Sequence, residues 1–225
     1  MKGTLANVIR TSLLGIIAAI ALLFVPAGTL NYWQGWAYLS TFTLCSLAYT
    51  VYLAKHDQAL LKRRTEVGIA HEQETAQKVV IFFVYVSFVA LVVVPPLDFR
   101  FGWSHVPWYV SIVGDALVVV SFYIFYLVSK VNTYAAANVR VEAGQKVIST
   151  GIYGRVRHPM YFGALFLMVG TPLALGSWWG LLLIPLFVIV LYFRLANEEK
   201  VLLRDLQGYA EYCARVRWHL IPGIF

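Results

Sequence analysis

The chain has 225 residues, of which 60% are hydrophobic and 13% are charged, and its mean hydropathy is +0.71. Soluble domains contain about 45–50% apolar and about 25% charged residues, so this composition excludes a compact soluble enzyme, a disordered protein and a collagen-like fibre. What remains is a multi-pass membrane protein, and the length favours one helix bundle over two separate domains.

Six apolar runs follow one another along the chain, and a helix needs about 20 residues to cross about 30 Å of hydrocarbon. The first four runs are Thr11–Leu30, Trp36–Ala54, Val79–Pro95 and Pro107–Lys130. The last two are shorter, about 22 Å each at 1.5 Å per residue, and they are Tyr161–Leu175 and Trp178–Tyr192. We predict an all-α, polytopic transmembrane bundle of about six spans, the last two forming a short hairpin. Residues 1–131 would form an N-terminal four-helix region, and residues 132–225 a second, functional region.

The basic residues fall on one side of these spans. Of the 18 Lys and Arg residues, only Arg100 lies in a segment on the other side. Basic residues accumulate on the cytoplasmic side of membrane proteins, so we expect both termini and the long loops in the cytoplasm and the protein in the plasma (inner) membrane. The net charge of +7 then reports orientation in a lipid bilayer, and we expect no nucleic-acid partner.

Neither the cysteines nor the acidic loop residues indicate a metal site. The two cysteines, Cys45 and Cys213, lie in segments of different character and have no neighbours in metal-ligand spacing. His71, Glu72 and Glu74 also lack such spacing, and we interpret them as a solvated face. We therefore expect no disulfide framework and no bound metal.

The first candidate site is the segment NTYAAANVRVEAGQKVISTGIYGRVRHPMYFG at residues 132–163. Arg157, His158, Tyr153 and Tyr161 lie there among glycines, directly before a span, and together they can form a pocket for a polar ligand with an aromatic part. Pro159 suits the first turn of the following helix, whose N-terminus favours anionic groups. The alternative is a basic interfacial loop in which the tyrosines anchor the headgroup region.

The second candidate site follows the last apolar run. Arg194 and Glu198 are four residues apart and share one face of a helix. Apolar positions continue at spacings of three and four through Cys213, which predicts one amphipathic helix lying on or under the bundle. The pair is either a clamp for substrate and cofactor or a surface ion pair worth a few tenths of a kcal/mol.

The two sites together form a recognisable pattern. It reads V-I-S-T-G-I-Y-x3-R-H-P-M-Y-x-G, then R-x3-E-E, then Y-x2-Y with a late Ile-Pro. This pattern resembles the isoprenylcysteine carboxyl methyltransferase family and the related phospholipid N-methyltransferases. The resemblance covers residues 132–225, and the sequence departs from the common form at Ile152, where the family usually has proline.

The resemblance implies an integral-membrane enzyme that uses S-adenosylmethionine, with residues 132–225 as its methyltransferase core. It implies that Arg194 and Glu198 lie at the substrate and methyl-transfer end. The cofactor contacts that it implies are Gln145, Lys146, Val147, Ile148, Tyr153, His158, Pro159, Met160, Tyr161 and Glu199.

The acceptor remains open between three chemistries. A carboxylate, such as that of a prenylated cysteine, is already ionised at pH 7 and needs only an arginine to orient it. A phospholipid amine or a small thiol must first lose a proton, which requires Glu198 or His158 as a base. Arg194 favours a lipid-like carboxylate. The alternative from another class is a membrane transporter, for which Asp115 is the one acid inside a predicted span; the oligomeric state is open.

Overall fold

The computed structural model describes residues 2–65, 75–135, 141–142 and 144–224, without side-chain detail for residues 2–13, 65 and 75–77. Within these ranges the chain is helical and has no β-strand, which confirms the predicted all-α class. The elements in chain order are α1 (Lys2–Ala27), α2 (Trp33–His56), α3 (Gln58–Thr65), α4 (Thr75–Phe101), α5 (Trp108–Val131), η2 (Gly151–Gly154), α6 (Pro159–Ala174), η3 (Trp179–Leu183), α7 (Ile184–Asp205) and α8 (Tyr209–Arg215).

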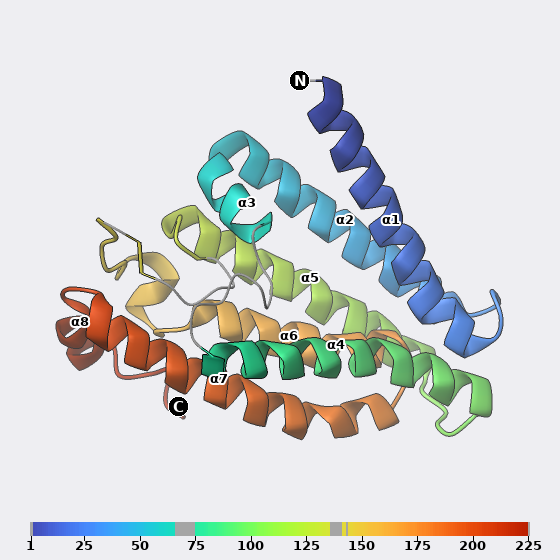
Figure 1. The fold of residues 1–225 in the computed structure, drawn as a ribbon. Coiled ribbons are helices and arrows are strands. Elements are labelled where there is room, and N and C mark those ends of the chain that lie inside the picture. Colours follow the sequence, from blue (N-terminus) through green and yellow to red (C-terminus); the bar gives the residue numbers. More distant parts are fainter. Residues whose placement is uncertain (1, 66–74, 136–140, 143, 225) are drawn as a thin grey trace.

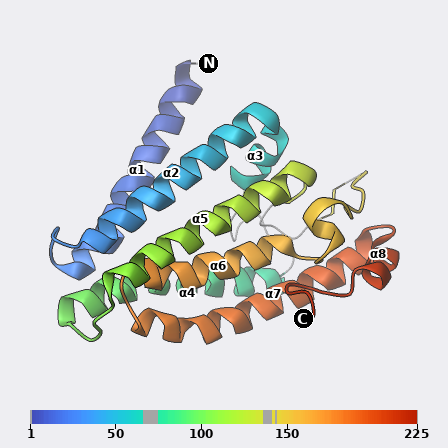
Figure 2. The ribbon, with the colours of Figure 1, turned by 180° about the vertical axis from the view of Figure 1, so that it is seen from behind.

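The long helices run side by side between two ends of different character (Figure 1). One end carries short turns between the helices. The other end, which we call the polar end, carries α3, the connection from α5 to α6, and α8. Figure 2 shows the same arrangement from behind, with α5 next to α6. Helices from both predicted regions pack together in one bundle, because α5 contacts α6 and α4 contacts α7. The division at residue 131 stays a prediction.

Each of the six predicted apolar runs overlaps a helix, the sixth run covering η3 and the first part of α7. Among the described residues, four helices are long and apolar enough to cross a membrane, over Trp33–His56, Lys78–Phe101, Trp108–Val131 and Trp179–Asp205. Two shorter apolar segments are Leu14–Ala27 and Pro159–Ala174. The 16 residues of α6 span only about 24 Å at 1.5 Å per residue, less than the hydrocarbon thickness of about 30 Å. The prediction that the fifth run is short is therefore confirmed.

Two predictions about the last part of the chain were wrong. The sixth run does not end near Tyr192, because α7 continues without interruption to Asp205. The amphipathic helix predicted through Cys213 is two helices, since Leu206 is extended and Gly208 takes a left-handed conformation with φ +84°. Glycine adopts that conformation without steric cost, so the chain turns there and α8 begins in a new direction.

A buried acid joins two loops at the end opposite the polar end. Asp98 of α4 is fully buried, and its carboxylate accepts hydrogen bonds from the backbone N–H of Ser104 at 2.7 Å and from the hydroxyls of Ser104 and Ser177. The Ser177 hydroxyl oxygen in turn accepts the N–H of Gly180 at 2.9 Å. A buried carboxylate is tolerated only when donors surround it, so this cluster connects the α4–α5 loop to the turn after α6.

The closest helix contact in the bundle is between α5 and α6. A Cβ atom added at Gly114 would lie 2.1 Å from the backbone nitrogen of Ala174, and one added at Gly170 would lie 2.9 Å from the carbonyl oxygen of Gly114. Small residues allow membrane helices to approach backbone to backbone. This contact sets the position of α6 against α5, and therefore the position of the residues at the beginning of α6.

We expect Gly114→Ala to destabilise the bundle, because the added methyl group meets backbone atoms that cannot rotate away. Overpacking costs about 1–3 kcal/mol and occasionally more, and we expect the upper part of that range in denaturant unfolding of the protein in detergent. The matched control is Gly15→Ala in α1, where nothing lies within 4 Å of the added Cβ. Equal unfolding midpoints for the two variants would contradict the close α5–α6 contact.

Candidate active site

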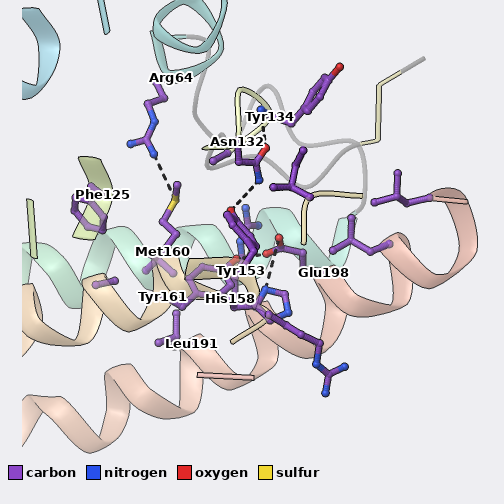
Figure 3. Close-up of a pocket in the computed structure, with 18 of the residues that line it drawn as sticks. Arg64, Phe125, Asn132, Tyr134, Tyr153, His158, Met160, Tyr161, Leu191 and Glu198 are labelled. Carbon is purple, nitrogen blue, oxygen red and sulfur yellow. Dashed lines mark hydrogen bonds and ion pairs between the residues drawn. The ribbon is translucent and has the colours of Figure 1, made fainter. Parts of the chain in front are cut away.

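A cavity of about 450 Å³ lies at the polar end of the bundle. Its walls come from α3, α4, α5, the α5–α6 connection, α6, α7 and α8 (Figure 3). One part of the lining is apolar and belongs to the long helices: Ile81, Val84, Phe88, Phe125, Met168, Phe187 and Leu191. The cavity therefore extends from the polar end into the apolar part of the bundle.

The α5–α6 connection forms the polar wall around Tyr153. The side chain of Asn132 donates a hydrogen bond to the Tyr153 hydroxyl at 2.8 Å, and the hydroxyl of Tyr212 on α8 donates to the Tyr153 carbonyl at 2.8 Å. Burial raises the pKa of Tyr153, so its hydroxyl remains protonated. Ile152, where the related family has proline, packs on the apolar cluster that includes Ile124 and Val128. The packing of Ile152 therefore positions the turn that contains it.

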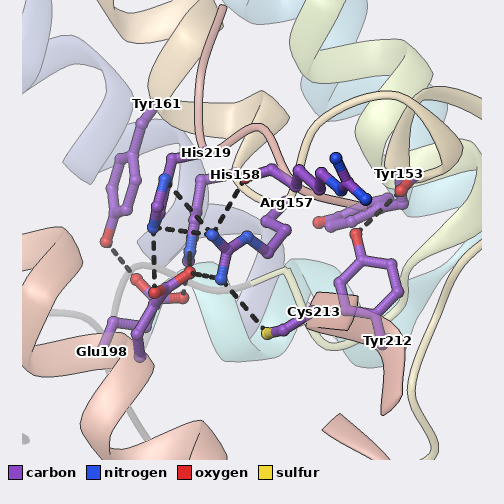
Figure 4. Close-up of polar contacts among 10 residues, drawn as sticks. Tyr153, Arg157, His158, Tyr161, Glu198, Tyr212, Cys213 and His219 are labelled. Carbon is purple, nitrogen blue, oxygen red and sulfur yellow. Dashed lines mark hydrogen bonds and ion pairs between the residues drawn. The ribbon is translucent and has the colours of Figure 1, made fainter. Parts of the chain in front are cut away.

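Glu199 of α7 is the centre of a charged network with Arg157, His158 and His219, and Figure 4 shows these three partners close together. The Glu199 carboxylate lies 2.9 Å from the guanidinium of Arg157, 3.1 Å from Nε2 of His158 and 3.1 Å from Nε2 of His219. Both Arg157 and Glu199 are mostly buried. Glu199 does not line the cavity. It holds the side chain of His158, which does line it, in a fixed position.

The neighbouring residue, Glu198, faces the cavity. Its carboxylate accepts a hydrogen bond from the Tyr161 hydroxyl, and Nδ1 of His158 lies 4.0 Å away. The rings of His158 and Tyr161 are stacked, with centroids 5.6 Å apart. Arg194, one turn earlier on α7, is only 4% exposed, lines the cavity and interacts electrostatically with the same Tyr161 hydroxyl. A cation, a phenol and a carboxylate therefore meet at one point of the cavity.

The segment after α8 also contacts this network. The backbone N–H groups of Arg157 and His158 donate to the carbonyls of Trp218 and His219, both at 2.9 Å. The guanidinium of Arg157 also donates to the sulfur of Cys213 at 3.2 Å. Burial lowers the pKa of His219. Residues 216–219 thus lie beside the beginning of α6 and fix it by both backbone and side-chain contacts.

Residues 109–208 match the family described as phospholipid methyltransferase. This segment is similar to that family, which is part of the isoprenylcysteine carboxyl methyltransferase-like superfamily. The match confirms the resemblance of the sequence motifs to these methyltransferases. It includes the α5–α6 connection, α6 and α7, which form most of the cavity, and it ends before α8.

One similar curated protein is a reductase. Delta(14)-sterol reductase TM7SF2 of Mus musculus is 32% identical over 94 residues, which cover 39% of this chain and 22% of that protein. The chain therefore spans about a fifth of the length of this relative. No solved structure matches the chain.

The structure brings together ten of the twelve predicted site residues. Those that line the cavity are Gln145, Lys146, Val147, Ile148, Tyr153, His158, Met160, Tyr161, Arg194 and Glu198. Pro159 and Glu199 do not line it. Pro159 is the buried first residue of α6, and Glu199 points to the charged network described above. Asp115 does not line the cavity, and His71, Glu72 and Glu74 lie outside the described residues.

Arg157, named in the first candidate site, also lines the cavity. Sequence reasoning missed several other cavity residues: Arg64, Asn132, Tyr134, Tyr209 and Tyr212. For Tyr209 and Tyr212 a signal existed, since they belong to the motifs that carry the family resemblance. Arg64 had no such signal, because it is one of several basic residues in a loop and only the tertiary structure brings it to the cavity.

We expect Glu199→Gln to destabilise the protein, because Arg157 and the two histidines lose their shared anion. Loss of a hydrogen bond to a charged group costs about 1.5–3 kcal/mol, to be measured by denaturant unfolding in detergent. The control is Lys200→Gln at the exposed neighbouring position. If both variants unfold at the same denaturant concentration, the network does not hold the polar end together.

Proposed function

We propose that this protein is an S-adenosylmethionine-dependent methyltransferase that acts on an amphiphilic, lipid-like acceptor such as the carboxylate of a prenylated cysteine. One observation carries the proposal. The cavity joins a polar cluster of Arg194, Tyr161 and Glu198 to an apolar wall that continues into the bundle. Such a space suits a water-soluble cofactor on one side and an apolar tail on the other.

The residues present fit the cofactor. The cavity volume lies within the range of about 300–1,000 Å³ for small-molecule pockets, and the hydroxyl of Tyr209, which lines it, is buried without a hydrogen-bond partner among the described residues. A bound ligand would supply the missing partner of this hydroxyl. The residues that would hold the cofactor are Gln145, Lys146, Val147, Ile148, Tyr153, His158, Met160 and Tyr161, with Pro159 and Glu199 supporting them from behind.

The cofactor would supply a methyl group activated as a sulfonium, so the protein needs no nucleophile of its own. The task of the side chains is to orient the acceptor and exclude water. Arg194 would hold an acceptor carboxylate, and Glu198 would limit where that anion can lie. For a phospholipid amine or a small thiol, Glu198 would instead accept the proton that must leave. The family match to phospholipid methyltransferases supports the amine as the alternative acceptor.

An apolar tail would lie between the long helices. Phe88, Phe125 and Leu191 come from three different helices and line the cavity there. Tyr85 of α4 lines the cavity and is 44% exposed. An exposed side chain of a membrane-length helix in the cavity wall supports a substrate that arrives from the bilayer.

The match to Delta(14)-sterol reductase favours a second candidate, a reductase acting on a membrane lipid. A reductase would require a hydride donor such as a nicotinamide cofactor in the same cavity. Both candidates therefore need a soluble cofactor at the polar end, and the identity of the cofactor that binds separates them.

We predict that the two halves of the site respond differently to mutation. His158→Ala and Tyr161→Ala should weaken the binding of S-adenosylhomocysteine, measured by calorimetry in nanodiscs. Arg194→Ala should leave that binding largely intact and reduce methyl transfer on the order of 30- to 1,000-fold, the effect of losing a contact of about 2–4 kcal/mol. Arg194→Lys should rescue poorly, since a point charge does not replace a bidentate fork.

Methyl transfer is compared on a prenylated cysteine analogue, a phosphatidylethanolamine and a small thiol, with the exposed Lys200→Ala on the same helix as control. Near-wild-type transfer by Arg194→Ala on every accepted substrate would remove Arg194 from the site. Binding of a reduced nicotinamide cofactor in place of S-adenosylhomocysteine by folded wild-type protein would favour the reductase.

We also propose that the polar end faces the cytoplasm and that the protein lies in the plasma (inner) membrane, as the distribution of Lys and Arg indicates. After replacement of Cys45 and Cys213 by serine, a single cysteine at exposed Trp103 should react with an impermeant maleimide added to whole cells. A cysteine at exposed Arg155 should react only after permeabilisation. Labelling of position 155 from outside would reverse the orientation.

A further inference from the structure

Two adjacent arginines of α3 have different surroundings. Arg63 forms a two-point ion pair with Glu142, with distances of 2.8 Å from Nε to Oε1 and 2.6 Å from Nη2 to Oε2. It also donates to the carbonyl of Thr133 at 3.0 Å and lies over the ring of Tyr134. Its charge is therefore neutralised within the protein, and it ties α3 to the α5–α6 connection.

Arg64 lines the cavity and has no carboxylate partner among the described residues. Its guanidinium donates to the sulfur of Met160 at 3.6 Å, as Figure 3 shows, and lies over the ring of Tyr49 with 5.1 Å to the centroid. Its Nε is buried without a hydrogen-bond acceptor in the described part of the chain. Burial lowers the pKa of Arg64, but an arginine remains charged at neutral pH.

A desolvated cation of this kind is costly unless an anion accompanies it. A thioether is a weak acceptor, and contact with an aromatic face recovers only about 0.5–2 kcal/mol. The planar guanidinium suits the paired oxygens of a carboxylate or a phosphate. Arg64 lines the same cavity as Met160, Phe125 and Arg194. A molecule bound in that cavity can therefore bring such an anion to the Arg64 guanidinium.

We propose that Arg64 binds the anionic group of an amphiphilic molecule, a carboxylate or a phosphate, and so selects anionic over neutral acceptors. This inference rests on the proposed function, whose acceptor class it narrows. Arg64 lies outside residues 109–208, the part of the chain that matches the methyltransferase family. The choice between anionic and neutral acceptors would thus depend on α3, which lies outside the matched segment.

We assign Arg64 to the acceptor rather than to the cofactor. Arg64 contacts Met160, one of the residues that would hold the cofactor, but it lies over the ring of Tyr49 on α2, a helix that supplies none of those residues. Four other residues that would hold the cofactor, Gln145–Ile148, belong to the α5–α6 connection. In Figure 3, Arg64 points from α3 toward Met160. A phosphate bound there would leave Arg194 available at the reacting end, whereas an acceptor with a single carboxylate would place it at either Arg64 or Arg194.

The experiment measures binding without methyl transfer, in nanodiscs of zwitterionic phosphatidylcholine. One probe pair is S-farnesyl-N-acetylcysteine and its neutral carboxamide, and the other is dioctanoyl phosphatidic acid and dioctanoylglycerol. We expect the wild-type protein to prefer the anionic member of at least one pair. In Arg64→Met that preference should fall on the order of 10- to 100-fold, and in Arg64→Lys it should fall less. Arg155→Met, which removes one exposed charge outside the cavity, should keep the wild-type preference.

A loss confined to one probe pair supports the proposal and identifies the anion as carboxylate or phosphate. Wild-type preference for both pairs in folded Arg64→Met overturns it. Binding of S-adenosylhomocysteine is measured in the same discs, and a weakening of more than about tenfold in Arg64→Met also overturns it, because Arg64 would then hold the cofactor. If Arg64→Met does not fold, Arg64→Lys and Arg64→Gln decide by the same ratio. Absence of S-adenosylhomocysteine binding by the wild type counts against the proposed function alone.

Discussion

The carboxylate of Glu199 joins three distant parts of the chain at the polar end of the bundle. It contacts Arg157 and His158 at the beginning of α6 and His219 near the end of the chain. Two backbone hydrogen bonds from the residues before α6 to residues 218 and 219 reinforce the junction. Because successive residues on a helix point about 100° apart, Glu198 faces the cavity while Glu199 faces this network. Glu199 thus positions the residues before α6, and Glu198 lines the cavity.

The bilayer explains why the charged side chains and the irregular backbone lie at one end of the bundle. Charged side chains and irregular backbone are costly within hydrocarbon, so the α5–α6 connection and the charged network belong at the polar end. The close α5–α6 contact at Gly114 and Gly170 brings a short helix into this arrangement, and the cavity reaches from its polar beginning to Met168 in its apolar part. A site of this form can meet a soluble cofactor and a lipid-like acceptor at the same place.

Much of the fold follows from patterns that are local in sequence. Apolar runs predicted the helices because hydrocarbon requires a continuous, internally hydrogen-bonded segment. Ten of the twelve predicted site residues line one cavity, since their motifs lie directly before α6 and within α7. The errors have local causes as well. Hydropathy ended the last run at Tyr192, but a helix can leave the membrane without breaking, and α7 continues to Asp205.

The sequence alone determined the helical class, the approximate spans and the composition of the candidate site, because hydrophobic period and motif spacing are properties of short segments. Only the tertiary structure decided that Glu198 faces the cavity and Glu199 faces the charged network, since the resemblance implied a cofactor contact for Glu199 and the motif does not show what packs against each acid. It also decided the different roles of Arg63 and Arg64, which are adjacent and chemically identical. One of them meets the carboxylate of Glu142 and the other meets the cavity, because α3 packs beside segments more than 60 residues away in the chain.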